Sequence, residues 1–276
     1  MTFCMAKSAV LIMKLYTMET KFMIMFYFSA TGNSKYVADL FCKKTNAACY
    51  SIEENVDFVE LLGANEIIGF CYPIYGSRVP KLMREFVENN AEILCNKKII
   101  IFCTQYIWSG DGARAFTDLL PRDSVEVIYA EHFFMPNNIC NFFLLPLESK
   151  KKIAKYPLKT ERKMQRVCDN IEKGIVKKRG FNPISKALGA ILGSFFPRFE
   201  KMAKNRVWLD KDCNKCRLCI IICPMDNFDD EHDKITTNNN CMMCYRCINK
   251  CPQKAIRVFL RKKVKKQFKG VGRYDG

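Results

Sequence analysis

Two copies of one cysteine spacing lie near the end of this 276-residue chain. Each copy has the pattern CxxCxxCxxxCP, and Cys241 follows Cys213 by 28 positions. Within one copy, a tight loop brings three thiolates to the same side, because each two-residue gap returns the next side chain to that side. Three thiolates so placed could bind one cube of iron and sulfide, whose fourth ligand must come from elsewhere. We call residues 213–224 the first run and residues 241–252 the second run.

The spacing also predicts how the two runs share their ligands. In chains with two such runs, the fourth cysteine of each run binds the other cluster. The expected ligands of one [4Fe–4S] cluster are Cys213, Cys216, Cys219 and Cys251. Those of the other cluster are Cys241, Cys244, Cys247 and Cys223. Zinc is the alternative because CxxC pairs also build tetrahedral zinc sites, but zinc gives no reason for the third cysteine of each run or for the proline after the last.

A second group of residues suited to chemistry forms the loop Ser29-Ala30-Thr31-Gly32-Asn33-Ser34. A short apolar run over residues 23–28 precedes it, and a helical pattern over residues 35–44 follows it. In a strand, polar loop and helix of this kind, hydroxyls and backbone N–H groups can converge on a phosphate at the helix N-terminus. Gly32 would let the backbone approach closely. The loop lacks the lysine of a Walker motif and the pattern GxGxxG, which disfavours binding of ATP and dinucleotides. Taken alone, the loop could also be an ordinary polar turn that binds no phosphate.

Further strands and helices are expected to position this loop. Apolar runs over residues 66–72, 98–104 and 125–134 predict buried strands, each followed by a loop with glycine, proline or aromatic residues. Helices are expected over residues 81–89 and 112–120. Alternating strands and helices predict a parallel sheet with helices on both faces, whose ligands bind at the carboxyl ends of the strands. At that edge Tyr75, Tyr106 and Trp108 could stack on a flat cofactor.

The loops at this edge resemble the flavin site of flavodoxins. The segment FSATGNS is similar to the phosphate loop of that family, usually written (S/T)xTGNT, with Ser34 in place of the last threonine. The resemblance implies FMN as a cofactor and a doubly wound, parallel, five-stranded sheet. It assigns FMN binding to Ser29, Thr31, Gly32, Asn33, Ser34, Pro73, Ile74, Tyr75, Gly76, Thr104, Gln105, Tyr106, Gly110 and Asp111.

A flavodoxin-like half joined to a two-cluster ferredoxin half resembles the anaerobic ferredoxins of the EFR1 family. Segments PIYGSRVP, SGDGA and MPNN are similar to that group, and the resemblance covers roughly residues 22–260. It implies an α/β domain followed by a small α+β ferredoxin domain. Together the two domains would pass electrons between the clusters, FMN and a redox partner. The expected organisation is an N-terminal extension over 1–21 (disordered, or due to a start codon placed too early), an FMN domain over 22–180, an apolar linker over 181–205, a ferredoxin domain over 206–260 and a basic tail over 261–276.

The charge of the chain suggests the kind of partner. The formal net charge is +17, and bound clusters and flavin phosphate would leave about +11, which favours an acidic redox protein. The basic segment over residues 149–179 is expected to be one long helix without a nucleic-acid-binding motif. A zinc-containing nucleic-acid adaptor is therefore disfavoured. No uninterrupted apolar stretch is long enough for a transmembrane helix. The apolar segment over 181–205 is expected to dock the two halves of the chain on each other, and a peripheral membrane contact is the alternative.

The eight cysteines outside the runs are scattered without a pairing pattern. They indicate reduced thiols and a cytoplasmic location, and oxygen-sensitive clusters would suit an anaerobe. The enzyme alternative is a flavin-dependent reductase of a small molecule fed by the clusters. Such an enzyme needs a proton donor, and Tyr75, Tyr106 or His132 could serve, but none has a diagnostic neighbour. The sequence therefore favours an electron carrier and names no catalytic residue.

Overall fold

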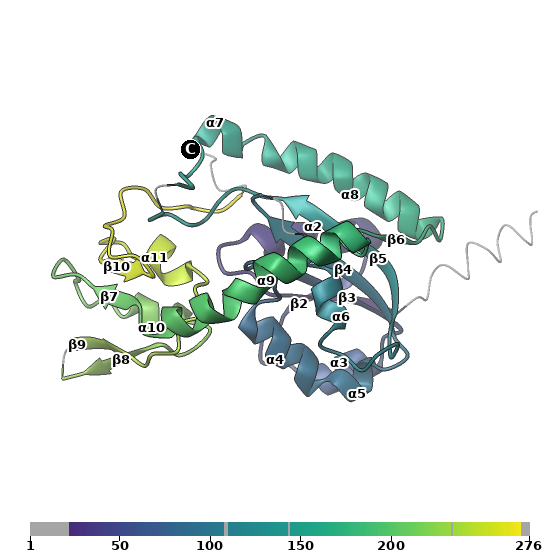
Figure 1. Ribbon diagram of the computed structural model, residues 1–276, viewed down its shortest axis with the longest axis horizontal. Helices are drawn as coiled ribbons and strands as arrows, with labels where there is room; N and C mark the ends of the chain where they lie inside the picture. Colours follow the sequence, from purple (N-terminus) through teal and green to yellow (C-terminus); the bar gives the residue numbers. More distant parts are fainter. Residues whose placement is uncertain (1–21, 108–109, 143, 233, 272–276) are drawn as a thin grey trace, which may run out of the picture.

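The computed structural model describes residues 22–107, 110–142, 144–232 and 234–271. We call residues 22–181 the sheet lobe and residues 206–271 the cysteine lobe. The long helix α9 (Pro183–Lys204) runs along one side of the sheet lobe and ends beside the cysteine lobe (Figure 1). The expectations for residues 1–21 and for Trp108 lie outside the described residues.

A parallel sheet of six strands forms the centre of the sheet lobe, in the order β2-β1-β3-β4-β5-β6. The predicted doubly wound α/β fold is confirmed, but the predicted number of five strands is wrong. The short β6 pairs in parallel with β5 and adds an edge to the sheet. The strands are β1 (Met23–Tyr27), β2 (Ala48–Ser51), β3 (Ile67–Pro73), β4 (Lys98–Gln105), β5 (Glu126–Phe134) and β6 (Lys177–Lys178).

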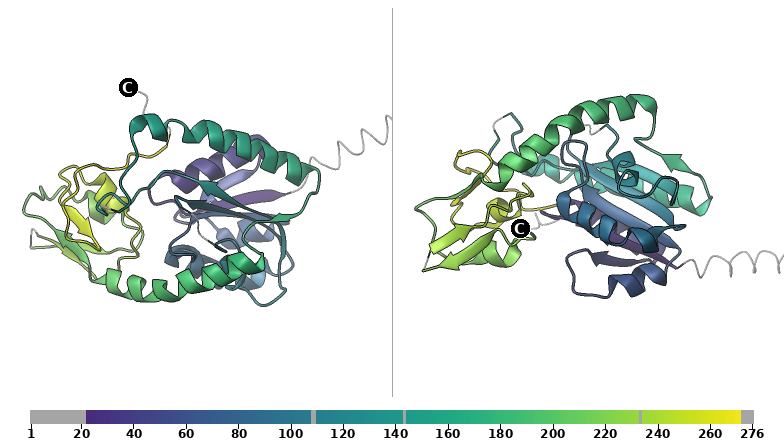
Figure 2. Two further views of the ribbon diagram at one scale, coloured as in Figure 1. Left: turned by 45° about the horizontal axis from the view of Figure 1, so that its top comes forward. Right: turned by 60° about the horizontal axis from the view of Figure 1, so that its bottom comes forward.

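Helices cover both faces of the sheet because successive side chains of a strand point to opposite faces. Ile24 and Phe26 of β1 belong to one core, and Met25 and Tyr27 belong to the other. Figure 2 shows the two helical layers on either side of the sheet. One layer contains α2 (Asn33–Thr45) and α8 (Tyr156–Glu172), and the other contains α3 (Phe58–Gly63), α4 (Lys81–Asn89), α5 (Ala91–Leu94) and α6 (Arg114–Thr117).

Two of the expected helical segments differ from the structure. The basic segment over residues 149–179 is divided into α7 (Lys150–Ile153), α8 and β6. Pro157 lies in the first turn of α8, where a proline is tolerated because its missing N–H has no intrahelical acceptor. The helix expected over residues 112–120 is reduced to α6.

Most of the segment expected to be an apolar linker forms α9, Pro183–Lys204. The side chain of Asn182 caps its first turn by accepting a hydrogen bond from the Ser185 N–H at 2.8 Å. Gly189 permits close packing on the sheet lobe, since a Cβ there would lie 1.6 Å from Asp111 Oδ1. Further along, Arg84 pairs with Glu200 at 2.9 Å. These contacts fix α9 against the loops at the carboxyl edge of the sheet.

The cysteine lobe consists of two similar halves. Strands β7 (Val207–Leu209) and β10 (Ile256–Val258) pair antiparallel, as do β8 (Phe228–Glu231) and β9 (Lys234–Thr237). Each run ends in a short helix, α10 (Leu218–Ile222) or α11 (Arg246–Lys250). Positive φ angles recur at the same offset as the cysteines, in the pairs Lys215 and Met243, Arg217 and Tyr245, and Asp226 and Lys254. The sequence repeat is therefore also a repeat of backbone conformation.

Two buried titratable residues on β5 connect stability to pH. Burial would raise the pKa of Glu131, but hydrogen bonds from Lys177 and Lys163 lower it to about 2. Burial lowers the pKa of His132 from 6.5 to about 4, and the cations Arg179 and Lys163 contribute in the same direction. His132 is 2% exposed and is therefore neutral in the folded protein near pH 7.

We expect the His132→Gln variant to lose less stability in mild acid than the natural chain. The unfolded chain protonates this histidine below about pH 6.5, whereas the folded chain does so near pH 4, so folding becomes less favourable as the pH falls between these values. From pH 6.5 to pH 5 the loss due to His132 is about 2 kcal/mol. Urea unfolding at both pH values measures it. An equal pH dependence in the two proteins would contradict this assignment.

Candidate cofactor site between the two lobes

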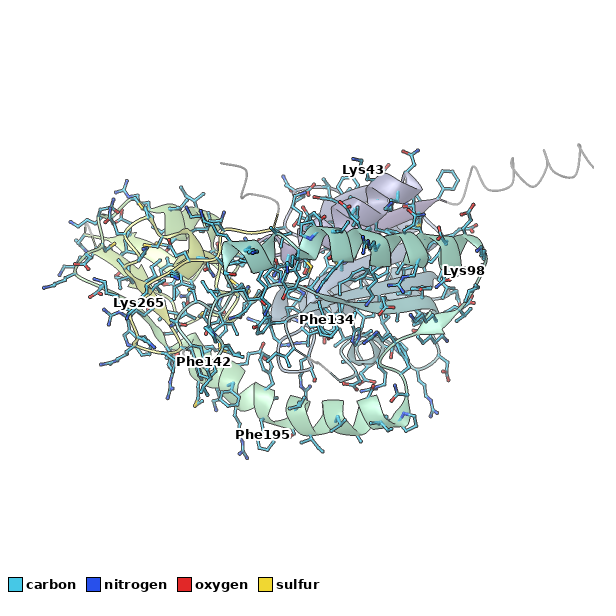
Figure 3. All side chains as sticks on the ribbon, turned by 90° about the horizontal axis from the view of Figure 1, so that it is seen from above. Lys43, Lys98, Phe134, Phe142, Phe195 and Lys265 are labelled. Carbon is cyan, nitrogen blue, oxygen red and sulfur yellow. The ribbon has the colours of Figure 1, made fainter. Side chains whose placement is uncertain are left out.

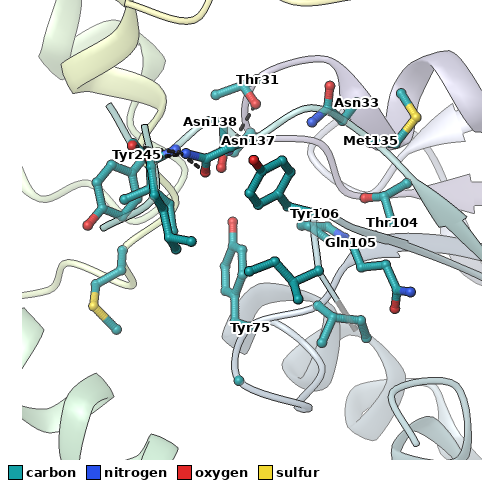
Figure 4. A pocket seen from close by; sticks show the side chains of 18 of the residues that line it. Thr31, Asn33, Tyr75, Thr104, Gln105, Tyr106, Met135, Asn137, Asn138 and Tyr245 are labelled. Carbon is teal, nitrogen blue, oxygen red and sulfur yellow. Dashed lines mark hydrogen bonds between the residues drawn. The ribbon is translucent and has the colours of Figure 1, made fainter. Parts of the chain in front are cut away.

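A cavity of about 600 Å³ lies between the carboxyl edge of the sheet, α9 and the cysteine lobe. Its volume is within the range of cofactor sites. The loops after β1, β3, β4 and β5 line it from the sheet lobe (Figure 4). On the other sides it is lined by Leu192, Phe196 and Phe199 of α9 and by Met243, Tyr245 and Phe259 of the cysteine lobe.

The cavity brings together most of the predicted flavin-binding residues. Those that line it are Ser29, Thr31, Asn33, Ser34, Pro73, Ile74, Tyr75, Gly76, Thr104, Gln105 and Tyr106. Gly32 is not in the lining but caps α2 with a left-handed backbone, at φ 101°. Gly110 and Asp111 do not line the cavity either, because α9 covers their loop. Asp111 instead pairs with Arg114 at 2.7 Å and contacts Gly189.

The loop between β1 and α2 has the geometry of an anion site. The Gly32 N–H donates to Ser29 Oγ at 3.2 Å, which closes the turn. The next residues, Asn33 and Ser34, begin α2, and the first N–H groups of a helix have no intrahelical acceptor. The positive end of the helix dipole is at this loop. Ser34 Oγ is hydrogen-bonded to Thr104 Oγ1 at 2.7 Å, which ties the loop to the end of β4.

Two buried polar atoms in the lining have no hydrogen-bond partner among the described residues. These are Asn33 Oδ1 and the hydroxyl of Tyr75. Buried polar groups are normally hydrogen-bonded, so a bound group with hydroxyls and carbonyls would complete the site. Burial raises the pKa of Tyr75 well above its usual value, so its hydroxyl keeps its proton as a donor. The anion site suits the phosphate of a flavin, and these two polar atoms suit the hydroxyls and carbonyls of its ribityl chain and ring.

The Cys223 thiol lies near the first three cysteines of the second run. Burial raises the pKa of Cys247, and the nearby thiols of Cys244, Cys241 and Cys223 raise it further. Cys223 thus lies with the three cysteines of the second run. Burial raises the pKa of Cys219 to about 11, and the nearby thiols of Cys213 and Cys216 act in the same direction.

Backbone amides of the cysteine lobe donate to cysteine sulfurs. The Asn227 N–H points to Cys223 Sγ and the Ala255 N–H to Cys251 Sγ, both at 3.3 Å. Hydrogen bonds to the sulfurs tune iron–sulfur clusters. In the described part of the chain, no three potential ligands converge as on a single ion. A cube of four irons and four sulfides is larger than one ion, so the thiolates that bind it stand further apart than ligands of a single ion.

The second run adjoins the cavity and the first run does not. Met243 and Tyr245 alternate with cysteines of the second run, and both line the cavity. Cys244 and Cys247 are buried, whereas Cys216 of the first run is exposed. Cys219 of the first run is buried as well, so the first run reaches solvent at Cys216, and the second run lies beside the cavity.

Arg246, which the sequence did not single out, holds the two lobes together. Its guanidinium donates to the carbonyl oxygens of Ser29 and Ala30, each at 3.1 Å, and so contacts the backbone of the polar loop. It also pairs with both carboxylate oxygens of Glu53, at 2.6 and 2.5 Å. A single arginine between two cysteines carries no pattern, so only the fold reveals this contact.

A second bridge between the lobes passes through asparagines. Asn249 Nδ2 donates to the Asn138 carbonyl at 2.8 Å. Asn138 Nδ2 donates in turn to Thr31 Oγ1 at 3.0 Å (Figure 4). Asn141 Nδ2 donates to the Val258 carbonyl at 2.9 Å. The MPNN segment after β5 therefore links the polar loop to the cysteine lobe.

Comparisons with known proteins support both kinds of site. Residues 24–139 match the family model described as a flavodoxin domain, and residues 206–263 match the one described as a 4Fe-4S dicluster domain. The chain thus joins a flavodoxin domain to an iron–sulfur domain, as predicted. These domains are typical of electron transport by flavin and iron–sulfur centres.

Similar solved structures include two bacterial flavoproteins. Oxidised flavodoxin 2 from Bacillus cereus is 17% identical, with 54% of this chain and 98% of that one covered and a TM-score of 0.37. A putative flavoprotein from Bacteroides eggerthii is 16% identical, with 41% and 88% covered and a TM-score of 0.34.

A curated relative is similar to one short segment. Over 51 residues the chain is 38% identical to the archaeal-type glutamate synthase (NADPH) of Dehalococcoides mccartyi. The segment represents 17% of this chain, and the chain spans about a tenth of the length of that relative.

Proposed function

We propose that this protein is an electron carrier that joins FMN in the cavity to two [4Fe–4S] clusters on the eight cysteines of the runs. The observation that carries the proposal is that the second run and the polar loop line the same cavity. When bound, a flavin supplies one- or two-electron chemistry, and each cluster supplies single electrons. This organisation agrees with the resemblance to the EFR1 family, with residues 22–180 as the flavin domain and 206–260 as the ferredoxin domain.

The residues of the chain have distinct parts in this proposal. Ser29, Thr31 and the first amides of α2 would hold the phosphate, and the Tyr75 hydroxyl would donate to the flavin. The apolar side chains of Phe196 and Met243 would exclude water between the flavin and the second run. The cluster held by Cys241, Cys244, Cys247 and Cys223 would then be next to the flavin.

The other cluster, on Cys213, Cys216, Cys219 and Cys251, would be the contact for a redox partner. The exposure of Cys216 supports contact between this cluster and a partner at the protein surface. The net charge of +17 favours an acidic partner protein. Electrons would then pass between the surface and the cavity through the two runs in order.

Cofactor analysis of anaerobically purified protein tests the proposal. We expect a brown protein with about eight irons and eight acid-labile sulfides per chain, which releases one FMN on denaturation. A colourless protein with stoichiometric zinc and no flavin would overturn it.

A flavin-dependent reductase of a small molecule is the second candidate, and the Tyr75 hydroxyl favours it. This proton donor is buried in the cavity without a partner among the described residues. His132, by contrast, does not line the cavity. Oxidation of the reduced protein by a small molecule, with no exchange with carrier proteins, would favour the reductase.

We expect Ser29→Asp to weaken FMN binding at least tenfold while the iron content stays unchanged. Aspartate can still accept the hydrogen bond from the Gly32 N–H, but it places a negative charge beside the proposed phosphate, where repulsion between unit charges amounts to a few kcal/mol, about 3 at an effective dielectric of 20. Fluorescence titration of deflavinated protein with FMN measures the change. Ser29→Asn is the neutral control of matching shape, and equal affinities in the two variants would contradict the phosphate assignment.

A further inference from the structure

α9 exposes a continuous apolar stripe. Its members recur every three or four residues and therefore lie on one face of the helix. The exposed fractions are 72% for Ile184, 36% for Leu188, 58% for Ile191, 43% for Leu192, 55% for Phe195, 44% for Phe199 and 39% for Met202. Figure 3 shows Phe195 on the outer side of the helix, away from the sheet.

The cofactor site accounts for little of this stripe. Leu192 and Phe199 reach the edge of the cavity, but the other five residues do not line it. α9 already packs on the lobes through a different face, which contains Ser185, Gly189, Gly193, Phe196 and Ala203. Soluble monomers rarely expose a long apolar patch, and such a patch usually marks an interaction site.

The charges of α9 indicate what covers the stripe. Its four basic residues, Lys186, Arg198, Lys201 and Lys204, are all exposed. Its one acidic residue, Glu200, is paired with Arg84. Two copies of the helix placed face to face would bring like charges together, which disfavours a dimer through this surface. An apolar stripe with basic neighbours is typical of a helix that lies in the plane of an anionic lipid surface.

We propose that α9 docks the protein on the surface of an anionic bilayer. The stripe would enter the boundary of headgroups and acyl chains, and Arg198 and Lys201, which lie beside the stripe at helical spacing, would contact acidic headgroups. The protein would lie on the membrane and not cross it, because none of the described helices combines the length and hydropathy needed to span a bilayer. The inference stands on α9 alone and does not depend on the proposed electron transfer.

Co-sedimentation of the intact protein with lipid vesicles tests this docking. We expect the protein to bind phosphatidylcholine vesicles that contain about 30% phosphatidylglycerol, and to bind vesicles of phosphatidylcholine alone at least tenfold more weakly. Added salt should weaken binding to the anionic vesicles. The double variant Ile191→Glu, Phe195→Glu should bind the anionic vesicles at least tenfold more weakly. The matched control is the double variant Leu158→Glu, Val176→Glu, which adds the same two charges at exposed apolar residues outside α9, at 53% and 58%.

Other outcomes would overturn the proposal. If the double variant and the natural chain bound the vesicles equally, the affinity would come from the overall positive charge of the protein and not from the stripe. No binding to anionic vesicles would remove the membrane as the partner. A dimer in solution that the double variant abolishes would assign the stripe to a second copy of the chain. Unchanged iron and flavin contents of the variants establish that they remain folded.

Discussion

Replacing Cys223 with serine is expected to remove the cluster of the second run, although residue 223 belongs to the first. The Cys223 thiol lies near Cys241, Cys244 and Cys247, so we expect it to be their fourth ligand. Serine is a poor substitute for a thiolate on iron, because iron–sulfur clusters select soft sulfur ligands. Iron content should fall from about eight to about four atoms per chain.

The signal that disappears identifies the cluster. In electron paramagnetic resonance of the reduced protein, Cys223→Ser should lose the same signal as Cys241→Ser, and Cys251→Ser the same signal as Cys213→Ser. Cys140→Ser is the control, since Cys140 is a half-buried thiol packed on the cysteine lobe outside both runs, and it should retain all iron. If Cys223→Ser instead matched Cys213→Ser, each run would bind its own cluster.

Arg246→Ala should weaken the contact between the two lobes and weaken flavin binding. The change removes hydrogen bonds to two carbonyls of the polar loop and leaves Glu53 without its cation, although that carboxylate is only 23% exposed. Breaking a largely buried ion pair costs about 3 kcal/mol, which we expect as a loss in the free energy of unfolding. The dissociation constant of FMN should rise at least tenfold.

A second arginine provides the comparison for Arg246. Arg217 is 64% exposed and pairs with Asp230 alone among the contacts described for it. Exposed pairs contribute less than about 1 kcal/mol, so Arg217→Ala should change neither stability nor flavin affinity much. Urea unfolding and FMN titration measure both effects. Similar losses in the two variants would mean that Arg246 acts as an ordinary surface charge.

The fold could be predicted where the pattern is local. The central strands β1, β3 and β4 are short apolar runs that end in small polar loops, and their order along the chain implies a parallel sheet. That topology alone places the loops after residues 28, 73 and 105 at one edge, which explains why most of the flavin-binding residues were found. The strand β2 is partly exposed and β6 is very short, so neither has a periodic signal.

Contacts that depend on how distant segments pack could not be predicted from local patterns in the sequence. The glycines and proline of the apolar segment over 181–205 suggested a linker, yet Gly189 is required where α9 crosses Asp111, and the Gly193 carbonyl accepts a hydrogen bond from Arg78 Nε at 2.9 Å. The same crossing removes Gly110 and Asp111 from the cavity. Arg246 contacts residues more than 190 positions away in the chain, with spacings of 193 to Glu53 and 217 to Ser29.

The contact of Arg246 with the polar loop has a consequence for how the protein matures in the cell. Arg246 stands between Cys244 and Cys247, so its position depends on a loop that is expected to take its final shape when the cluster is inserted, as metal binding and folding are coupled. An iron-free chain would present the polar loop without its guanidinium and would hold flavin weakly. Coupling of this kind is reciprocal, so flavin would in turn stabilise the cluster. Iron supply would then set the flavin content of the protein, and iron starvation would deplete both cofactors together.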